Sequence, residues 1–156
     1  AAEMLTVSAK DVGSVVLVGP MGIKPDDGFI FDQAIVSYID YAKMAFHDPK
    51  AFAGVYGDVS TDQLEAWDIA REMCFRIAWK PYMYSQTLPH LLRSVTTPAL
   101  IVWGDQDKIV PPSTAAQFKT ALPNAKVEIV AGAGHAVALE KPTELRGIVD
   151  AFISAA

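Results

Sequence analysis

The sequence predicts an α/β fold: the C-terminal part of a doubly wound, mostly parallel sheet, with three strands and an inserted helical lid. Two short apolar runs, at 15–18 and 99–103, and a third run at 127–130 that alternates once, stop close to a glycine, which is typical of strands within a sheet. A helical pattern separates the last two runs, and another follows the third. Because strand–helix–strand connections of this length join parallel strands by right-handed crossovers, we expect a parallel sheet.

The predicted core elements follow from local composition. A helix is expected over 1–9, which is rich in Ala, Glu, Met and Leu. The run Val15–Val18 is continuously apolar, so it is expected to be buried on both faces. Helices are also expected from Pro112 to Leu122 and from Pro142 to about Ser154, since proline is tolerated in a first turn. The last helix has apolar residues at helical spacing: Leu145, Ile148, Val149 and Phe152.

Residues 26–92 differ in kind from the rest of the chain. They contain most of the aromatic and methionine residues and no convincing strand. We therefore expect them to form a helical lid, inserted between two segments of one α/β core, 1–25 and 93–156.

Three helices are expected within the lid. The segment Phe29–Phe46 has small and apolar residues along one face of a single amphipathic helix. Ser60 is followed by Gln63 in the form of a capping box, which predicts a helix that begins there and ends before Pro81. A short helix around Pro89–Arg93 is expected to lead back to the core.

Composition excludes several function classes. The formal net charge is −5, and the 13 Lys and Arg residues are scattered, so neither nucleic acid nor an acidic membrane surface is an expected partner. Cys74 is the only cysteine, which excludes an internal disulfide and a cysteine-based zinc site and suits the cytoplasm. His, Asp and Glu never fall at metal-ligand spacing, so no metal or other cofactor is expected. No apolar stretch approaches the roughly 18 residues that span a bilayer.

The first informative segment is residues 99–112, ALIVWGDQDKIVPP. A buried strand runs into Gly104, and two acidic residues, Asp105 and Asp107, follow its C-terminal end. Ligands of parallel sheets bind at that edge, so a carboxylate there points toward a site. Aspartate is also common in turns, and the residues alone leave both interpretations open.

The second informative segment is residues 127–142, VEIVAGAGHAVALEKP. His135 lies in a glycine-rich loop directly after the last predicted strand, and an amphipathic helix follows the loop. A lone histidine is usually structural, but its place at the C-terminal edge of the sheet favours a functional residue.

Together the two segments resemble the α/β-hydrolase superfamily. The first is similar to its acid loop, in which the acid matches Asp107, and Asp105 falls on a variable position. The second is similar to its loop for the catalytic histidine, which matches His135, and Glu140 matches an acid before the final helix. The resemblance implies a catalytic triad whose acid precedes its histidine in the chain, as here. For Glu140 it implies a structural role at the N-terminus of the last helix.

The nucleophile of that family is not found in this sequence. It belongs in the pattern G-x-S-x-G, and none of the serines lies between glycines at that spacing. Cys74 lies inside a predicted lid helix and is a poor substitute. The N-terminus lacks the features of a signal peptide and begins with Ala in place of Met. We therefore expect the nucleophile in a missing N-terminal half, or in another chain, along the edge of the Val15–Val18 strand.

The resemblance implies a hydrolase that acts on a small apolar ester or a related carbonyl compound. Two alternatives stay open: a non-catalytic homologue that binds a ligand for signalling, and a dehalogenase or epoxide hydrolase with an aspartate nucleophile. Aromatic and methionine residues after the second lid helix either line a substrate pocket or pack lid against core. The predicted pocket residues are Trp79, Tyr82, Met83, Val110 and Ala136.

Overall fold

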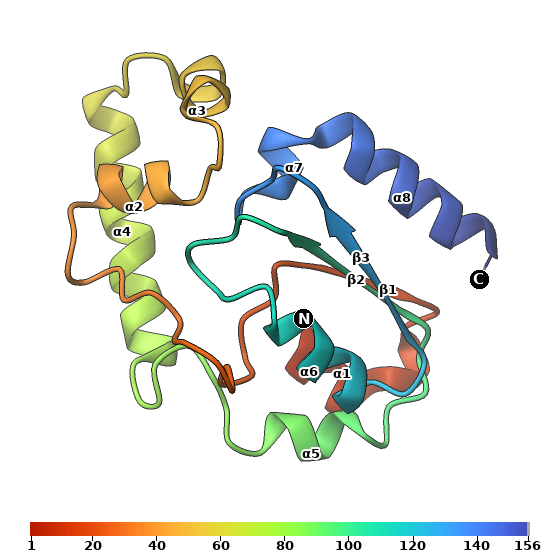
Figure 1. Ribbon diagram of the computed structural model, residues 1–156. Helices are drawn as coiled ribbons and strands as arrows, with labels where there is room; N and C mark the ends of the chain where they lie inside the picture. The colour runs from red at the N-terminus through yellow and green to blue at the C-terminus, as the bar shows by residue number, and fades with distance from the viewer. Residues whose placement is uncertain (156) are drawn as a thin grey trace.

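The computed structural model describes residues 1–155, and it confirms the α/β class and the parallel sheet (Figure 1). In these residues the strand order is β1–β2–β3. The elements in chain order are α1 (Ala2–Ser8), a 3-10 turn (Ala9–Asp11), β1 (Val15–Val18), α2 (Tyr38–Met44), α3 (Pro49–Tyr56), α4 (Thr61–Ala78), α5 (Leu88–Leu92), β2 (Ala99–Gly104), α6 (Thr114–Ala121), β3 (Ala125–Val130), α7 (Val137–Glu140) and α8 (Pro142–Ala155).

Strand β2 is the centre of the sheet, and every one of its residues is buried. It pairs in parallel with β1 and with β3, so all three strands end at the same edge. Among the described residues β1 has a neighbour on one side only, and of its four residues only Leu17 is buried. The prediction that Val15–Val18 is buried on both faces is therefore wrong for this part of the protein, because an edge strand is open along one side.

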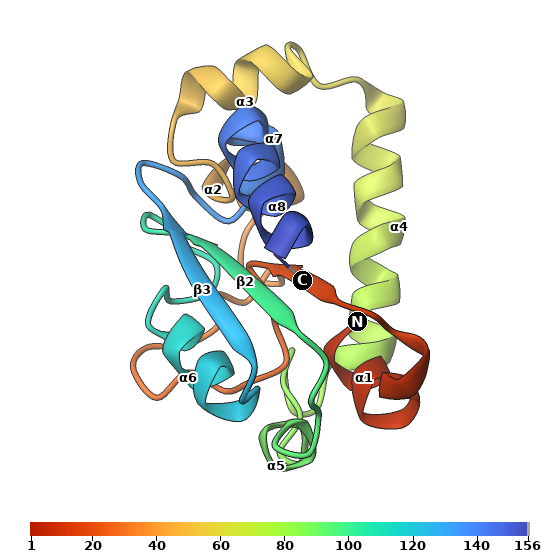
Figure 2. The ribbon, with the colours of Figure 1, turned by 90° about the vertical axis from the view of Figure 1, so that its right-hand side faces the viewer.

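Helices cover both faces of the sheet, as a doubly wound fold requires (Figures 1 and 2). Successive side chains of β2 point to opposite faces. On one face Ile101 and Trp103 pack in a cluster that includes residues of α1, α5 and α6. On the other face Leu100 and Val102 pack with Phe152 of α8. Helix α5 falls in the range predicted for the lid, yet Leu88 and Leu92 belong to the first of these core clusters.

The predicted helix Phe29–Phe46 is wrong in its first half, because helix α2 begins only at Tyr38. Ser37 is its N-cap, and the Ser37 hydroxyl accepts a hydrogen bond from the Asp40 N–H. The preceding segment instead runs beside the acid loop, where the Phe31 N–H donates to the Ile109 carbonyl at 2.8 Å. A contact between residues so distant in the chain outweighs the local helical pattern.

Helix α4 confirms the predicted cap, since the Ser60 hydroxyl accepts from the Gln63 N–H at 3.2 Å. It contacts the rest of the lid through Trp67, which stacks on Tyr38 at 5.5 Å between ring centroids, and Arg71, which lies over the same ring. None of the residues of this helix is buried. Ile69, Met73 and Ile77 recur at helical spacing along it and are all more than half exposed.

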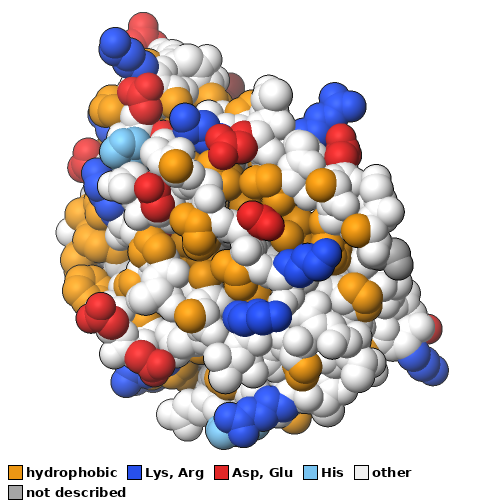
Figure 3. Space-filling view, turned by 45° about the vertical axis from the view of Figure 1, so that its right-hand side comes forward, with side chains coloured by type: hydrophobic (Ala, Val, Ile, Leu, Met, Phe, Trp, Pro, Cys, Tyr) orange, Lys and Arg blue, Asp and Glu red, His pale blue; other side chains and the backbone are white. Residues whose placement is uncertain are grey.

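Charged side chains of both signs lie interspersed among apolar ones on the face shown in Figure 3. No helix in residues 1–155 is long and apolar enough to cross a membrane.

Candidate active site

Two loops bring an acid and a base together at one edge of the sheet. The loop after β2 carries Asp107, and the loop after β3 carries His135. Because β2 and β3 are parallel neighbours, both loops leave the sheet at the edge where ligands of such sheets bind. The contact expected from the sequence is present: Oδ2 of Asp107 lies 2.8 Å from Nδ1 of His135.

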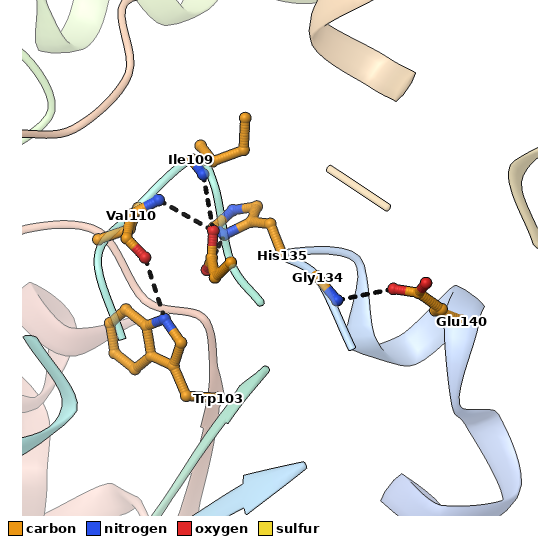
Figure 4. Close-up of polar contacts among 7 residues, drawn as sticks. Trp103, Ile109, Val110, Gly134, His135 and Glu140 are labelled. Atoms are coloured by element: carbon orange, nitrogen blue, oxygen red, sulfur yellow. Dashed lines mark hydrogen bonds and ion pairs between the residues drawn. The ribbon is translucent and has the colours of Figure 1, made fainter. Parts of the chain in front are cut away.

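The carboxylate of Asp107 is fully buried and fully hydrogen-bonded. Its side chain is 0% exposed. Oδ1 accepts the N–H groups of Ile109 at 2.8 Å and Val110 at 2.9 Å, which leaves Oδ2 for His135. The indole N–H of Trp103 donates to the Val110 carbonyl at 3.3 Å and ties the loop to β2 (Figure 4). A buried charge is costly unless it is paired in this way, so the loop is built around the carboxylate.

The contact with Asp107 determines which nitrogen of His135 is available for chemistry. An ionised carboxylate only accepts hydrogen bonds, so Nδ1 of the ring must carry the hydrogen. In the neutral imidazole the lone pair then lies on Nε2. Nε2 has no hydrogen-bond partner within residues 1–155, and the side chain is 23% exposed. The arrangement therefore presents a base toward the open side of the site.

Gly19, at the C-terminal end of β1, is a site residue that the sequence reasoning missed. A Cβ placed there would lie 3.2 Å from both Cε1 and Nδ1 of His135, and the backbone has φ +52°. The glycine N–H donates to the Val102 carbonyl at 2.9 Å, which extends the sheet pairing to this point. The available signal was a glycine directly after a strand, at the edge where the acid and base loops also lie.

Gly19→Ala is expected to destabilise the protein by about 1–2 kcal/mol, the typical cost of a left-handed backbone for a residue with a Cβ. The same methyl group should push the imidazole away from Asp107. Urea unfolding measures the first effect, and the NMR signal of the His135 Nδ1 proton measures the second. Gly147→Ala in α8, where a Cβ would meet nothing within 4 Å, should be neutral or stabilising. Equal stability and an unchanged Nδ1 signal in Gly19→Ala would contradict this role.

Two further carboxylates hold the loops of the site. Asp105, expected to be a turn residue, accepts the Gly132 N–H at 2.7 Å and so joins the two loops. Glu140 does not cap the final helix as the resemblance implied. It is the last residue of α7, and its carboxylate accepts the Gly134 N–H at 2.7 Å (Figure 4). Its other N–H donors lie in the lid segment that leads into α3.

The predicted pocket residues are found in three different environments. Val110 is buried, and its N–H donates to the carboxylate of Asp107. The Ala136 N–H donates to the Ala45 carbonyl, which lies beside the histidine loop. Trp79 and Tyr82 pack edge to face at 6.2 Å between centroids. Met83 lines a cavity of about 800 Å³ between the start of α1, the segment after β1 and the end of α4.

Two tyrosines of the lid, Tyr41 and Tyr82, are not bases. Burial raises the pKa of Tyr41 and also the pKa of Tyr82, so both phenols stay protonated at neutral pH. The Tyr82 hydroxyl donates to the Phe31 carbonyl at 3.3 Å and accepts the Gln33 N–H at 3.1 Å. The Tyr82 hydroxyl therefore acts as a hydrogen-bond group that holds the segment beside the acid loop.

Other candidates for chemistry lie away from the acid and base loops. Cys74 is exposed in the middle of α4. In residues 1–155 no group of three or more His, Cys, Asp or Glu side chains is placed to hold a metal ion.

Comparison with known proteins identifies the family of this site. The sequence model of the alpha/beta hydrolase fold family matches residues 58–142. The chain belongs to the α/β-hydrolase family. The matched residues include both loops, so the α/β-hydrolase resemblance drawn from them is confirmed.

The relatives of this α/β-hydrolase chain are longer proteins. The chain is 48% identical over 58 residues to ABHD14B of Homo sapiens, a candidate protein-lysine deacylase, in a match that covers 36% of the chain and 27% of the relative. It is 27% identical over 84 residues to the monoacylglycerol lipase ABHD6 of Rattus norvegicus, a match that covers 54% of the chain and 24% of the relative. Each match therefore covers only about a quarter of the relative's own length.

Solved structures show the same fold. A membrane phospholipase A, a bacterial virulence factor, superposes with a TM-score of 0.78 at 20% identity, over 99% of this chain and 53% of that one. A mutant of the meta-cleavage product hydrolase CumD superposes with a TM-score of 0.70 at 16% identity, over 99% and 60% of the two chains. The α/β-hydrolase chain thus spans little more than half the length of these structures.

Proposed function

We propose that this chain supplies the acid and the base of a serine hydrolase that cleaves carboxylic esters or related carbonyl compounds. The observation that carries the proposal is the Asp107–His135 pair, in which a buried carboxylate holds Nδ1 and leaves Nε2 without a partner in the described residues. The names of ABHD6, a lipase, and ABHD14B, a candidate deacylase, both denote chemistry at acyl groups, which supports a carbonyl substrate.

In the proposed reaction, Nε2 of His135 takes the proton of a serine hydroxyl as the serine oxygen attacks the carbonyl carbon of the substrate. Asp107 keeps Nδ1 protonated and stabilises the imidazolium that forms. The imidazolium then gives its Nε2 proton to the leaving alcohol, and an acyl-enzyme remains. Water, deprotonated by the same nitrogen, attacks the acyl carbon of the acyl-enzyme. The bond to the serine oxygen then breaks, the imidazolium returns the proton to that oxygen, and the carboxylic acid leaves.

The serine and the oxyanion-hole donors are proposed to come from outside this chain, from a segment that docks along β1. Three features on one side of the molecule support this location (Figure 2). The outer edge of β1 has no strand partner in the described residues, and such an edge favours strand addition. Beside this edge, Met4 and Val7 of α1 are 62% and 83% exposed. Helix α4 adds the exposed residues Ile69, Met73 and Ile77. The segment is either the N-terminal half of the same protein or a separate chain.

The apolar part of the substrate is proposed to occupy the cavity of about 800 Å³ beside α1. Met21, Ile77 and Met83 contribute to its lining, and such side chains adapt to varied apolar groups. Met21 follows Gly19 by two residues, and Gly19 lies against the His135 ring. Neither Asp107 nor His135 lines the cavity, so the link between the cavity and the base is this short segment of chain.

The experiment that tests the proposal compares the 156-residue chain with the intact protein that contains it, using p-nitrophenyl esters of short acyl chains. The chain alone should not exceed the rate of free imidazole, because the serine and the oxyanion-hole donors are proposed to lie outside it. The intact protein, or the chain co-expressed with the missing segment, should turn over the ester. Ester hydrolysis by the chain alone would contradict the external nucleophile. An intact protein that acts only on haloalkanes or epoxides, or that binds apolar ligands without turnover, would contradict the serine mechanism.

A further inference from the structure

His135 is held through both of its neighbours in the chain. The N–H of Gly134, just before it, donates to Oε2 of Glu140 at 2.7 Å (Figure 4). The N–H of Ala136, just after it, donates to the carbonyl of Ala45 at 2.8 Å. Ala45 is the C-cap of α2, so one of the two supports comes from the lid.

The other support reaches the lid as well. The Glu140 carboxylate also accepts the N–H of His47 at 3.1 Å and of Asp48 at 2.6 Å, residues that lead into α3. One half-buried carboxylate therefore accepts hydrogen bonds from three N–H groups, which belong to two segments that are distant from each other in the chain. Hydrogen bonds to an ionised acceptor are the strong ones, so this is a firm joint between the histidine loop and the lid.

The backbones at this joint are in direct contact. A Cβ on Gly134 would lie 2.5 Å from the Ala45 carbonyl oxygen and 2.8 Å from the His47 nitrogen. These are backbone atoms, which cannot move aside as a flexible side chain does. Only glycine allows the loop of His135 to lie this close to residues 45–48.

We propose that Glu140 is a positioning residue for His135, and that lid residues 45–48 are part of the support that orients the imidazole. Without Glu140, the donors of Gly134, His47 and Asp48 lose their common acceptor. Of the two supports, the hydrogen bond from Ala136 to Ala45 remains, so the loop is held less firmly against the lid. A misplacement of about 1 Å at a catalytic group costs about 100-fold in rate. The role extends the proposed function, and its kinetic readout rests on that function.

The test uses Glu140→Ala and Glu140→Gln in the intact protein. Glu140→Ala should lower kcat by about 10- to 100-fold and change KM by no more than about threefold, because the support acts on the base and not on substrate binding. Glu140→Gln keeps one carbonyl oxygen as an acceptor, so it should recover part of the loss. Glu144→Gln, an exposed carboxylate in the first turn of α8, is the matched control and should leave kcat unchanged.

A readout that does not need turnover separates this inference from the proposed function. In both Glu140 variants the NMR signal of the His135 Nδ1 proton should shift or broaden, and the amide of Gly134 should exchange faster with solvent. If the wild-type protein hydrolyses no ester, the proposed function fails, but these two measurements still test whether Glu140 positions His135. If Glu140→Ala does not fold, the same measurements on Glu140→Gln test the positioning role. Variants that match Glu144→Gln in kcat and in both signals, or that raise KM alone, overturn the positioning role.

Discussion

His135→Ala in the intact protein should lower the rate of ester hydrolysis by about 10⁴-fold or more, the scale of losing a member of a catalytic triad. The imidazole is the base whose Nε2 has no partner in the described residues, and the side chain of alanine offers no proton acceptor in its place. Because base and nucleophile act as one unit, removing either loses nearly the whole effect. The measurement is kcat and kcat/KM on a p-nitrophenyl ester, from rates over substrate concentrations that run from below KM to saturation.

His90→Ala is the matched control for that experiment. His90 is exposed on α5, so its loss should leave kcat unchanged. His90→Ala should unfold at nearly the same urea concentration as the wild type. His135→Ala leaves Oδ2 of the buried Asp107 without its partner, so it should unfold at a lower concentration, and circular dichroism checks that it is folded under the assay conditions. A His135→Ala protein that is folded and retains more than about a tenth of the activity would show that another group is the base.

Asp107→Asn should cost about 10³- to 10⁴-fold in kcat, less than or about as much as the loss of the histidine. The reason lies in how the two oxygens are used. Oδ1 accepts the N–H groups of Ile109 and Val110, so the single oxygen of asparagine is expected to stay there. The amide NH₂ then faces Nδ1 of His135 and donates to it. That interaction places the ring hydrogen on Nε2, which removes the lone pair needed for proton transfer.

NMR of the imidazole nitrogens distinguishes the two tautomers directly, and kcat measures the consequence. Asp150→Asn, an exposed carboxylate on α8, is the control and should change neither. If Asp107→Asn keeps the hydrogen on Nδ1 and full activity, Asp107 is not the group that orients the base.

The lid shows where local sequence patterns stop being informative. The helix cap at Ser60 was predicted correctly because the cap and its partner are three residues apart. The helix from Phe29 was predicted wrongly at its start, because its periodicity says nothing of the hydrogen bond from Phe31 to Ile109. The partial exposure of the β1 side chains was not predicted for the same reason: an apolar run specifies a strand, and its neighbours decide its burial.

The sequence alone determined the α/β class, the three parallel strands and the positions of Asp107 and His135, each directly after a strand. Those features depend on residues close together in the chain, so pattern and spacing were sufficient. Only the tertiary structure decided how each carboxylate is used: the two oxygens of Asp107 serve different donors, and Glu140 binds the lid instead of the last helix. It also placed Gly19 against the imidazole. These contacts join residues from separate strands and loops, and their geometry arises only when the sheet brings those segments to one edge.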